Sequence, residues 1–131
     1  DLRQKLGMAI VWITHDLGVI AGIADRVMVM YGGQVVEQAP VRELFANPQH
    51  PYTRMLLETV PNIRGDRQDK LRVIQGQPPI LSKAPESCPF RARCPQAFDR
   101  CAAQNPARFD VGPAHDAACF WDFKTGAPRH A

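Results

Sequence analysis

A run of six apolar residues, 8–13 (Met-Ala-Ile-Val-Trp-Ile), constrains the fold of this chain more than any other feature. Its length and its β-branched residues are typical of a strand buried on both faces, as in a parallel α/β sheet. The run ends in Thr14, His15 and Asp16. Ligands bind at the carboxyl ends of strands in open α/β sheets, so these three residues are expected at a ligand-facing edge.

The same three residues also fit a purely structural role. In that interpretation Thr14 or Asp16 caps the helix that follows, and His15 is a solvated loop residue. Residues 16–24 carry apolar side chains at helical spacing, although two glycines weaken the pattern. A helix over 16–24 is therefore expected to pack against the sheet.

The next segment predicts an antiparallel hairpin with strands at 27–31 and 34–38. Gly32 and Gly33 would form its turn, because both glycines can adopt the positive φ that a two-residue turn needs. Farther along the chain, residues 71–74 could form another short strand.

Two helices are expected after the hairpin. The first covers about 41–46, with Pro40 in its first turn and Leu44 and Phe45 facing inward. The Asn47-Pro48 pair ends this helix, and the second helix covers about 51–60 and is closed by Pro61.

Composition limits the possible function classes. The chain has 131 residues and a net charge of +3, which suits one average domain or two small ones. Its basic residues alternate with acidic ones, as in 64–70, which argues against a nucleic-acid-binding surface. No apolar run reaches the ~18–20 residues of a membrane span. The first residues carry neither an initiator Met nor a secretion signal, which is typical of a fragment.

Two stretches carry a family resemblance. Residues 13–17 (Ile-Thr-His-Asp-Leu) and 24–37 (Ala-Asp-Arg-Val-Met-Val-Met-Tyr-Gly-Gly-Gln-Val-Val-Glu) resemble the switch-histidine region of ABC-transporter ATPases. Residues 47–53 (Asn-Pro-Gln-His-Pro-Tyr-Thr) resemble the motif that opens the C-terminal extension of the oligopeptide/dipeptide importer branch. On residue chemistry alone, 47–53 is two helix stops with a turn between them.

The resemblance implies an α/β fold in two parts. Residues 1–47 would be the C-terminal piece of a RecA-like ABC ATPase domain, with a parallel strand, a β-hairpin and helices. Residues 48–131 would be the transporter C-terminal domain, a small Pro/Cys-rich irregular unit. The strand at 8–13 would lack its usual neighbours, so this chain alone would expose a long apolar edge.

The resemblance also implies a function for the full subunit, which would couple ATP binding and hydrolysis to import of di- and oligopeptides. His15 would contact the γ-phosphate of ATP, bound with magnesium, and help hold the attacking water. Asp16 would orient the loop through the start of the helix. Asp25 and Arg26 match a family position near the interface between two ATPase subunits.

The partners implied are a second ATP-binding subunit, the membrane-spanning permease subunits and, indirectly, a peptide-binding protein. The subunit would lie peripherally on the cytoplasmic face of the bacterial membrane. No nucleic acid is expected as a partner.

This chain lacks the groups that bind nucleotide phosphates. No Gly-Lys pair occurs in it, so the phosphate-cradling loop is missing. The acidic magnesium-binding strand end, the glutamine loop and the signature motif are missing too. Phosphoryl transfer depends on phosphate cradling and a metal, so we expect no ATP hydrolysis from the chain alone.

Four cysteines stand in the last third of the chain, at Cys88, Cys94, Cys101 and Cys119. A pair of disulfides is possible in number but needs an oxidising compartment. Structural zinc fits four thiolates, with His115 as a substitute ligand, although the spacings lack short zinc knuckles. An iron–sulfur cluster tolerates such spacings.

Residues 88–95 (Cys-Pro-Phe-Arg-Ala-Arg-Cys-Pro), with Cys101 after them, resemble the C-terminal domain of peptide-importer ATPases. Members with this pattern are associated with a [4Fe–4S] cluster. The resemblance ranks the cluster first, zinc second and free thiols third. An alternative function is a metal-stapled interaction module, held by zinc or iron–sulfur, without nucleotide chemistry.

Overall fold

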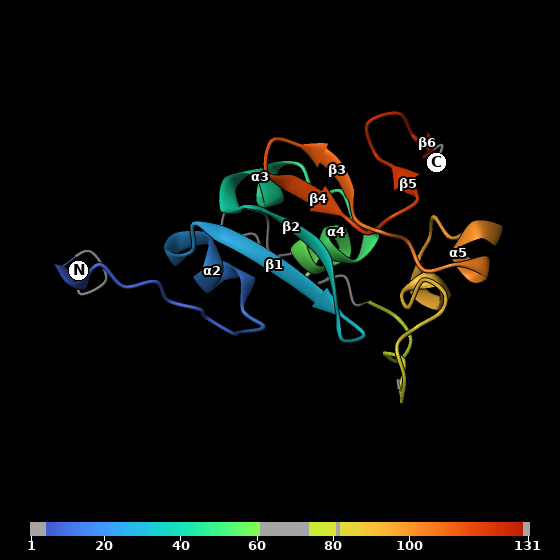
Figure 1. Cartoon of the computed structure of the whole chain (residues 1–131), viewed down its shortest axis with the longest axis horizontal. Coiled ribbons are helices and arrows are strands. Elements are labelled where there is room, and N and C mark those ends of the chain that lie inside the picture. The colour runs from blue at the N-terminus through green and yellow to red at the C-terminus, as the bar shows by residue number, and fades with distance from the viewer. Residues whose placement is uncertain (1–4, 61–73, 81, 130–131) are drawn as a thin grey trace, which may run out of the picture.

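The computed structural model describes residues 5–60, 74–80 and 82–129. Its central element is a four-stranded antiparallel sheet with the strand order β1-β2-β4-β3 (Figure 1). β1 (Arg26–Tyr31) and β2 (Gln34–Pro40) form the predicted hairpin. Gly32 and Gly33 make its turn with φ values of 55° and 72°, as the sequence predicts.

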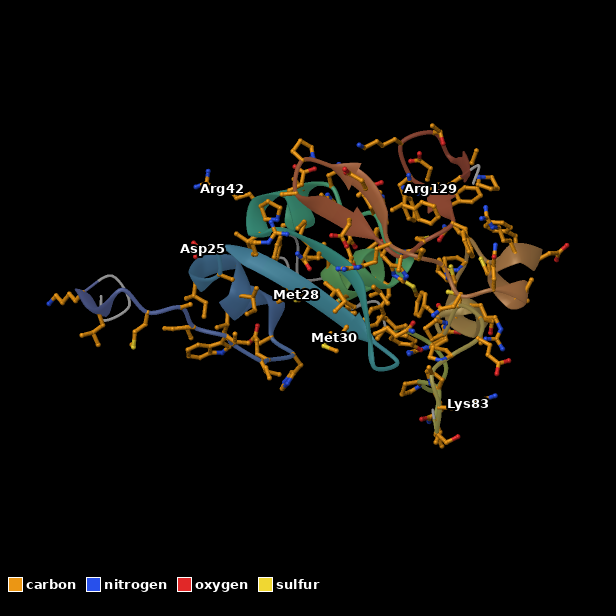
Figure 2. The ribbon with its side chains drawn as sticks, viewed as in Figure 1. Asp25, Met28, Met30, Arg42, Lys83 and Arg129 are labelled. Carbon is orange, nitrogen blue, oxygen red and sulfur yellow. The ribbon has the colours of Figure 1, made fainter. Side chains whose placement is uncertain are left out.

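Burial alternates along β1. Val27, Val29 and Tyr31 point into the core, whereas Met28 and Met30 on the opposite face are 62% and 60% exposed. Figure 2 shows these two methionines on the outer side of the strand. One face of β1 is thus packed, and its other face presents apolar side chains to solvent.

Three helices pack against the buried face of the hairpin. α2 (Leu17–Ile23) contributes Ile20, and α3 (Val41–Ala46) contributes Leu44, which is fully buried. α4 (Pro51–Glu58) packs partly buried apolar side chains against the same core. The three predicted helices are confirmed. Pro40 is the residue just before α3 rather than part of its first turn.

The predicted parallel strand at 8–13 is wrong. These residues run in an extended arm without strand pairing, and Val11 and Ile13 are 90% and 94% exposed. Figure 1 shows the arm leaving the body of the molecule at the N-terminal end. A strand needs a neighbour for its N–H and C=O groups, and no described segment lies beside the arm. Among the described strands every pairing is antiparallel.

The C-terminal part adds two strands to the hairpin. β3 (Phe109–Gly112) pairs with β4 (His115–Ala117), and β4 pairs with β2 through Glu37 opposite Ala117. The expectation that residues 48–131 are irregular is therefore wrong at these strands. The sheet takes strands from both sides of residue 47, and the division of the chain there stays a prediction.

The remaining elements are short. They are the 3₁₀ helix η1 (Arg91–Arg93), the helix α5 (Asp99–Ala103), and a small hairpin of β5 (Trp121–Asp122) with β6 (Ala127–Pro128). The predicted strand at 71–74 lies outside the described residues except for Ile74, which is not in a strand. Across the part of the chain that the structure describes, no helix is long and apolar enough to span a membrane.

Candidate functional site

The loop before α2 carries the predicted switch histidine. Thr14 Oγ1 accepts a hydrogen bond from the Asp16 backbone N–H at 3.0 Å, and Asp16 Oδ1 accepts one from Val19 N at 3.2 Å. Asp16 is therefore the N-cap of α2, which satisfies one of the unpaired N–H groups at the helix start. His15 stands between these two turns with its side chain exposed.

Asp25 precedes β1 and Arg26 is its first residue. The Asp25 carbonyl accepts a hydrogen bond from Val41 N at 3.0 Å, at the start of α3. Arg26 Nη2 donates to the carbonyl of Ala114 at 3.2 Å. Both contacts hold the chain around β1, and the predicted place of these residues at a subunit interface stays a prediction.

The four cysteines come from separate segments and line one cavity. Cys88 precedes η1, Cys94 ends it, Cys101 lies in α5, and Cys119 follows β4. The Cys88 N–H donates to the Cys101 carbonyl at 3.0 Å, and the Trp121 N–H donates to Cys119 Sγ at 3.4 Å. The fold thus brings four cysteines that are distant in the sequence to the lining of one cavity.

Burial sets the chemistry of these thiols. It raises the pKa of the Cys94 thiol to about 11 and that of the Cys119 thiol to about 12. Burial also raises the pKa of the Cys88 thiol, and the neighbouring cysteines add to each shift. These thiols are therefore neutral and weakly nucleophilic near pH 7, and any metal that they bind must displace protons.

The donor set of this cavity fits a group held by thiolates, because four sulfurs and one imidazole line it. Its volume of ≈ 10 Å³ leaves room for about one water molecule. Among the described residues, no group of three or more Cys, His, Asp or Glu side chains is arranged to hold a metal ion. A bound group would therefore require the cysteine side chains around the cavity to rearrange.

The imidazole in this cavity belongs to His50, whose residue is 2% exposed. His50 is the N-cap of α4, and its Nδ1 accepts a hydrogen bond from Tyr52 N at 3.1 Å. Burial lowers the pKa of His50 to about 3, so the ring is neutral at physiological pH. The ring centroid lies 5.9 Å from that of Phe90, which also lines the cavity.

A buried carboxylate fixes the backbone at His50. Glu37 is fully buried in β2, and its Oε1 accepts from Gln49 N at 2.5 Å while its Oε2 accepts from His50 N at 3.0 Å. Oε1 also lies 2.8 Å from Nε2 of His115, a buried residue of β4. One side chain thus links β2, the start of α4 and β4.

Comparison with known proteins identifies the family. Residues 36–101 match the family described as the oligopeptide/dipeptide transporter, C-terminal region. The chain belongs to this family. It is 47% identical, over 92% of its length, to a probable peptide ABC transporter ATP-binding protein of Sinorhizobium fredii. It is 46% identical, over 98% of its length, to the oligopeptide transport ATP-binding protein AppD of Bacillus subtilis.

A putative peptide import ATP-binding protein of Brucella ovis is 43% identical over 93% of the chain. The chain spans only 36% to 39% of the length of these three relatives. The family resemblance drawn from residues 13–17, 24–37 and 47–53 is thereby confirmed.

The predicted site residues of this transporter family member fall into two separate groups. His15 and Asp16 lie at the start of α2, whereas the four cysteines lie around α5, at the opposite end of the molecule in Figure 1. His115, considered as a substitute metal ligand, lies against Glu37 and does not line the cavity. The roles of the four cysteines, His15 and Asp16 in binding metal or ATP stay predictions.

Sequence reasoning missed the contacts of two buried polar residues, His50 and Glu37. The motif at 47–53 singles out His50 in the sequence, but it does not predict that His50 lies at the cysteine cavity. Glu37 has no local signal, because its partner His115 is 78 positions away.

Hydrogen bonds of Arg93 connect the cysteine region to the β1-β2 hairpin. Arg93 donates to the Tyr31 hydroxyl at 3.2 Å and to the carbonyls of Gln75 at 2.8 Å and Ile74 at 2.9 Å. The Tyr31 ring packs edge-on against Phe90, with centroids 5.1 Å apart. Arg93 thus holds residues 74–75 beside Tyr31 and the aromatic side chains next to the cavity.

Proposed function

We propose that this chain is the C-terminal part of an ATP-binding subunit that drives import of di- and oligopeptides across a bacterial cytoplasmic membrane. The observation that carries this proposal is the match over 92% to 98% of the chain to ATP-binding proteins named for peptide transport. The match includes the loop with His15, which the family resemblance assigns to the nucleotide.

His15 would act at the γ-phosphate of ATP. A neutral imidazole can donate one hydrogen bond and accept another, which suits contact with both a phosphate oxygen and a water. The capping bonds of Thr14 and Asp16 support this role, because they fix the loop while His15 stays exposed. Phosphate cradling and magnesium binding would come from sequence that this chain does not contain.

The exposed apolar surface supports a larger assembly. The arm at 8–13 and the outer face of β1 present apolar side chains to solvent. An exposed apolar surface of this kind marks a contact with further protein. In the whole subunit, further protein would cover the apolar side chains of the arm.

The partners would be a second ATP-binding subunit, permease subunits in the membrane and, through them, a peptide-binding protein. The subunit would be peripheral on the cytoplasmic face. In this assembly, Asp25 and Arg26 would lie near the interface between the two ATP-binding subunits.

The cysteine cavity would hold a [4Fe–4S] cluster, with zinc as the alternative. Cys88, Cys94, Cys101 and Cys119 would be the ligands, and the group would fix the segments around α5 to one another and supply a redox-active centre. A single zinc ion needs its sulfur ligands about 2.3 Å from one point, whereas a cluster holds its thiolates farther apart.

Metal analysis tests this part of the proposal. Anaerobically purified chain should contain about four irons and four acid-labile sulfides and absorb broadly near ~400 nm. One zinc without iron would make the site a structural staple. A colourless chain free of both metals would refute the metal site.

ATP turnover tests the proposed role of His15. The chain would be joined to the upstream part of the Bacillus subtilis relative, in place of the matching C-terminal part. This chimera should hydrolyse ATP, and the chain alone should not. His15→Ala should abolish turnover, whereas His130→Ala, a histidine near the C-terminus, should not. Equal turnover of all chimeras would refute the role of His15.

The second candidate is an interaction module without nucleotide chemistry, which the compact cysteine cavity favours. A chimera that folds, binds metal and yet neither binds nor hydrolyses ATP would support this candidate over the transporter subunit.

A further inference from the structure

The ring of His50 carries its proton on the nitrogen that faces away from its own helix. Tyr52 N–H donates to Nδ1, and a nitrogen that accepts a hydrogen bond cannot also be protonated. The neutral ring therefore holds its proton on Nε2. The capping bond of α4 thus sets the tautomer of His50.

The Nε2–H group lacks an acceptor of its own. Within the described residues, the hydrogen bonds at His50 use its backbone N–H, its carbonyl and its Nδ1, and none uses Nε2. The residue is 2% exposed, and its ring lines the cavity that the four cysteines share. The ring lies at the cavity and its Nε2–H is free to donate, so a sulfur acceptor there would satisfy it.

The backbone under the ring is held in place. Glu37 accepts the N–H of Gln49 and of His50, and the Phe90 ring lies beside the imidazole. The ring therefore has little freedom to turn away from the sulfurs. Proteins orient the groups around a metal centre in the same way, with hydrogen bonds from surrounding residues that hold each group in place.

We infer that His50 is a positioning residue of the sulfur site, whose Nε2–H donates a hydrogen bond to a cysteine thiolate or to a sulfide once the cysteines hold a bound group. The inference rests on the sulfur site proposed above. Hydrogen bonds to sulfur stabilise the more negative, reduced form of a cluster and so raise its reduction potential.

Two substitutions separate this donor from the helix cap. His50→Asn places an amide oxygen near the position of Nδ1, so it keeps the cap acceptor and removes the donor at Nε2. His50→Gln places an amide nitrogen near the position of Nε2, so it keeps the donor and removes the cap acceptor.

The first measurement is the midpoint potential of chain reconstituted with iron and sulfide. His50→Asn should lower the potential, with a tenfold loss in the reduction equilibrium equal to about 59 mV for one electron. His50→Gln should stay near the wild type, although it should be the less stable of the two variants. The inference would be overturned if the less stable variant, His50→Gln, had the lower midpoint potential, or if neither variant changed the potential.

A second measurement needs no metal. A long-range ¹H–¹⁵N spectrum of the metal-free chain near pH 7 should show His50 protonated on Nε2 alone. The Nε2–H signal should shift in Cys94→Ala and stay unchanged in Glu86→Gln. If the wild type takes up no iron, the sulfur site fails, and this spectrum decides the role of His50 by itself. A proton on Nδ1, or a signal insensitive to Cys94→Ala, would contradict it.

Discussion

Glu37 shows how much one buried side chain can organise. Its two oxygens accept the backbone N–H groups of Gln49 and His50 and contact the His115 ring, and it is fully buried. A buried carboxylate is tolerated when its oxygens are hydrogen-bonded in this way, because unpaired buried charge is strongly unfavourable. The carboxylate also defines the start of α4, and through it the place of His50.

Even the conservative replacement of Glu37 by glutamine should therefore destabilise the chain strongly. Glu37→Gln puts an amide donor against backbone donors and should lower the free energy of unfolding by about 1–3 kcal/mol or more. Glu86→Gln is the matched control, because the Glu86 carboxylate is 81% exposed in a surface ion pair with Lys83. The control should change stability by less than about 0.5 kcal/mol. Urea unfolding measures both, and equal effects would contradict the role of Glu37.

His50 should make stability depend on acid pH. Burial lowers the pKa of His50 from 6.5 to about 3, so the unfolded chain binds a proton in this window that the folded chain does not. Stability is then full above pH 6.5 and is lost as the pH falls toward 3, by about 1.4 kcal/mol per pH unit for this proton.

The measurement compares urea unfolding of the wild type and His50→Asn between pH 7 and pH 4.5. Carboxylates titrate in both chains, so the difference between the two slopes isolates the histidine. The variant should lose less stability toward acid than the wild type. Parallel slopes would show that the buried ring contributes no such dependence.

At the scale of elements, the hairpin and its helices follow from local chemistry. The Gly32-Gly33 turn, the Asp16 cap and the helix after Pro40 depend on neighbours within a few residues, and the structure has each of them. The strand at 8–13 depends on a partner from elsewhere, so its apolar pattern alone could not place it. The same limit hid the Glu37 contact with His115, which joins distant strands.

Two glycines in open surroundings should respond oppositely to alanine. Gly33 has φ +72° and no atom within 4 Å of the place that a Cβ would take, so Gly33→Ala meets only backbone strain and should cost ~1–2 kcal/mol. Gly22, in α2, has equal space without a positive φ. Gly22→Ala should stabilise the chain by about 0.4–1 kcal/mol. Thermal unfolding of both variants measures this, and changes of the same sign would contradict the turn geometry.

At the scale of the whole molecule, the two ends differ in how much apolar surface they expose. The N-terminal end presents an apolar arm, the exposed His15 loop and the outer face of β1 (Figures 1 and 2). The other end is closed around the cysteine cavity and α5. The sheet β1-β2-β4-β3 joins them, with Arg93 and Glu37 as its links to the cysteine region. The proposal of a larger subunit predicts that further protein covers the apolar end.

Peptide uptake tests this account most directly. The matching C-terminal part of the Sinorhizobium fredii relative would be replaced by this chain, and the gene returned to cells that lack the relative. Uptake of a labelled oligopeptide should be restored by the chimera and lost again with His15→Ala. A chimera that is produced at normal levels and assembles at the membrane, yet restores no uptake, would contradict the account.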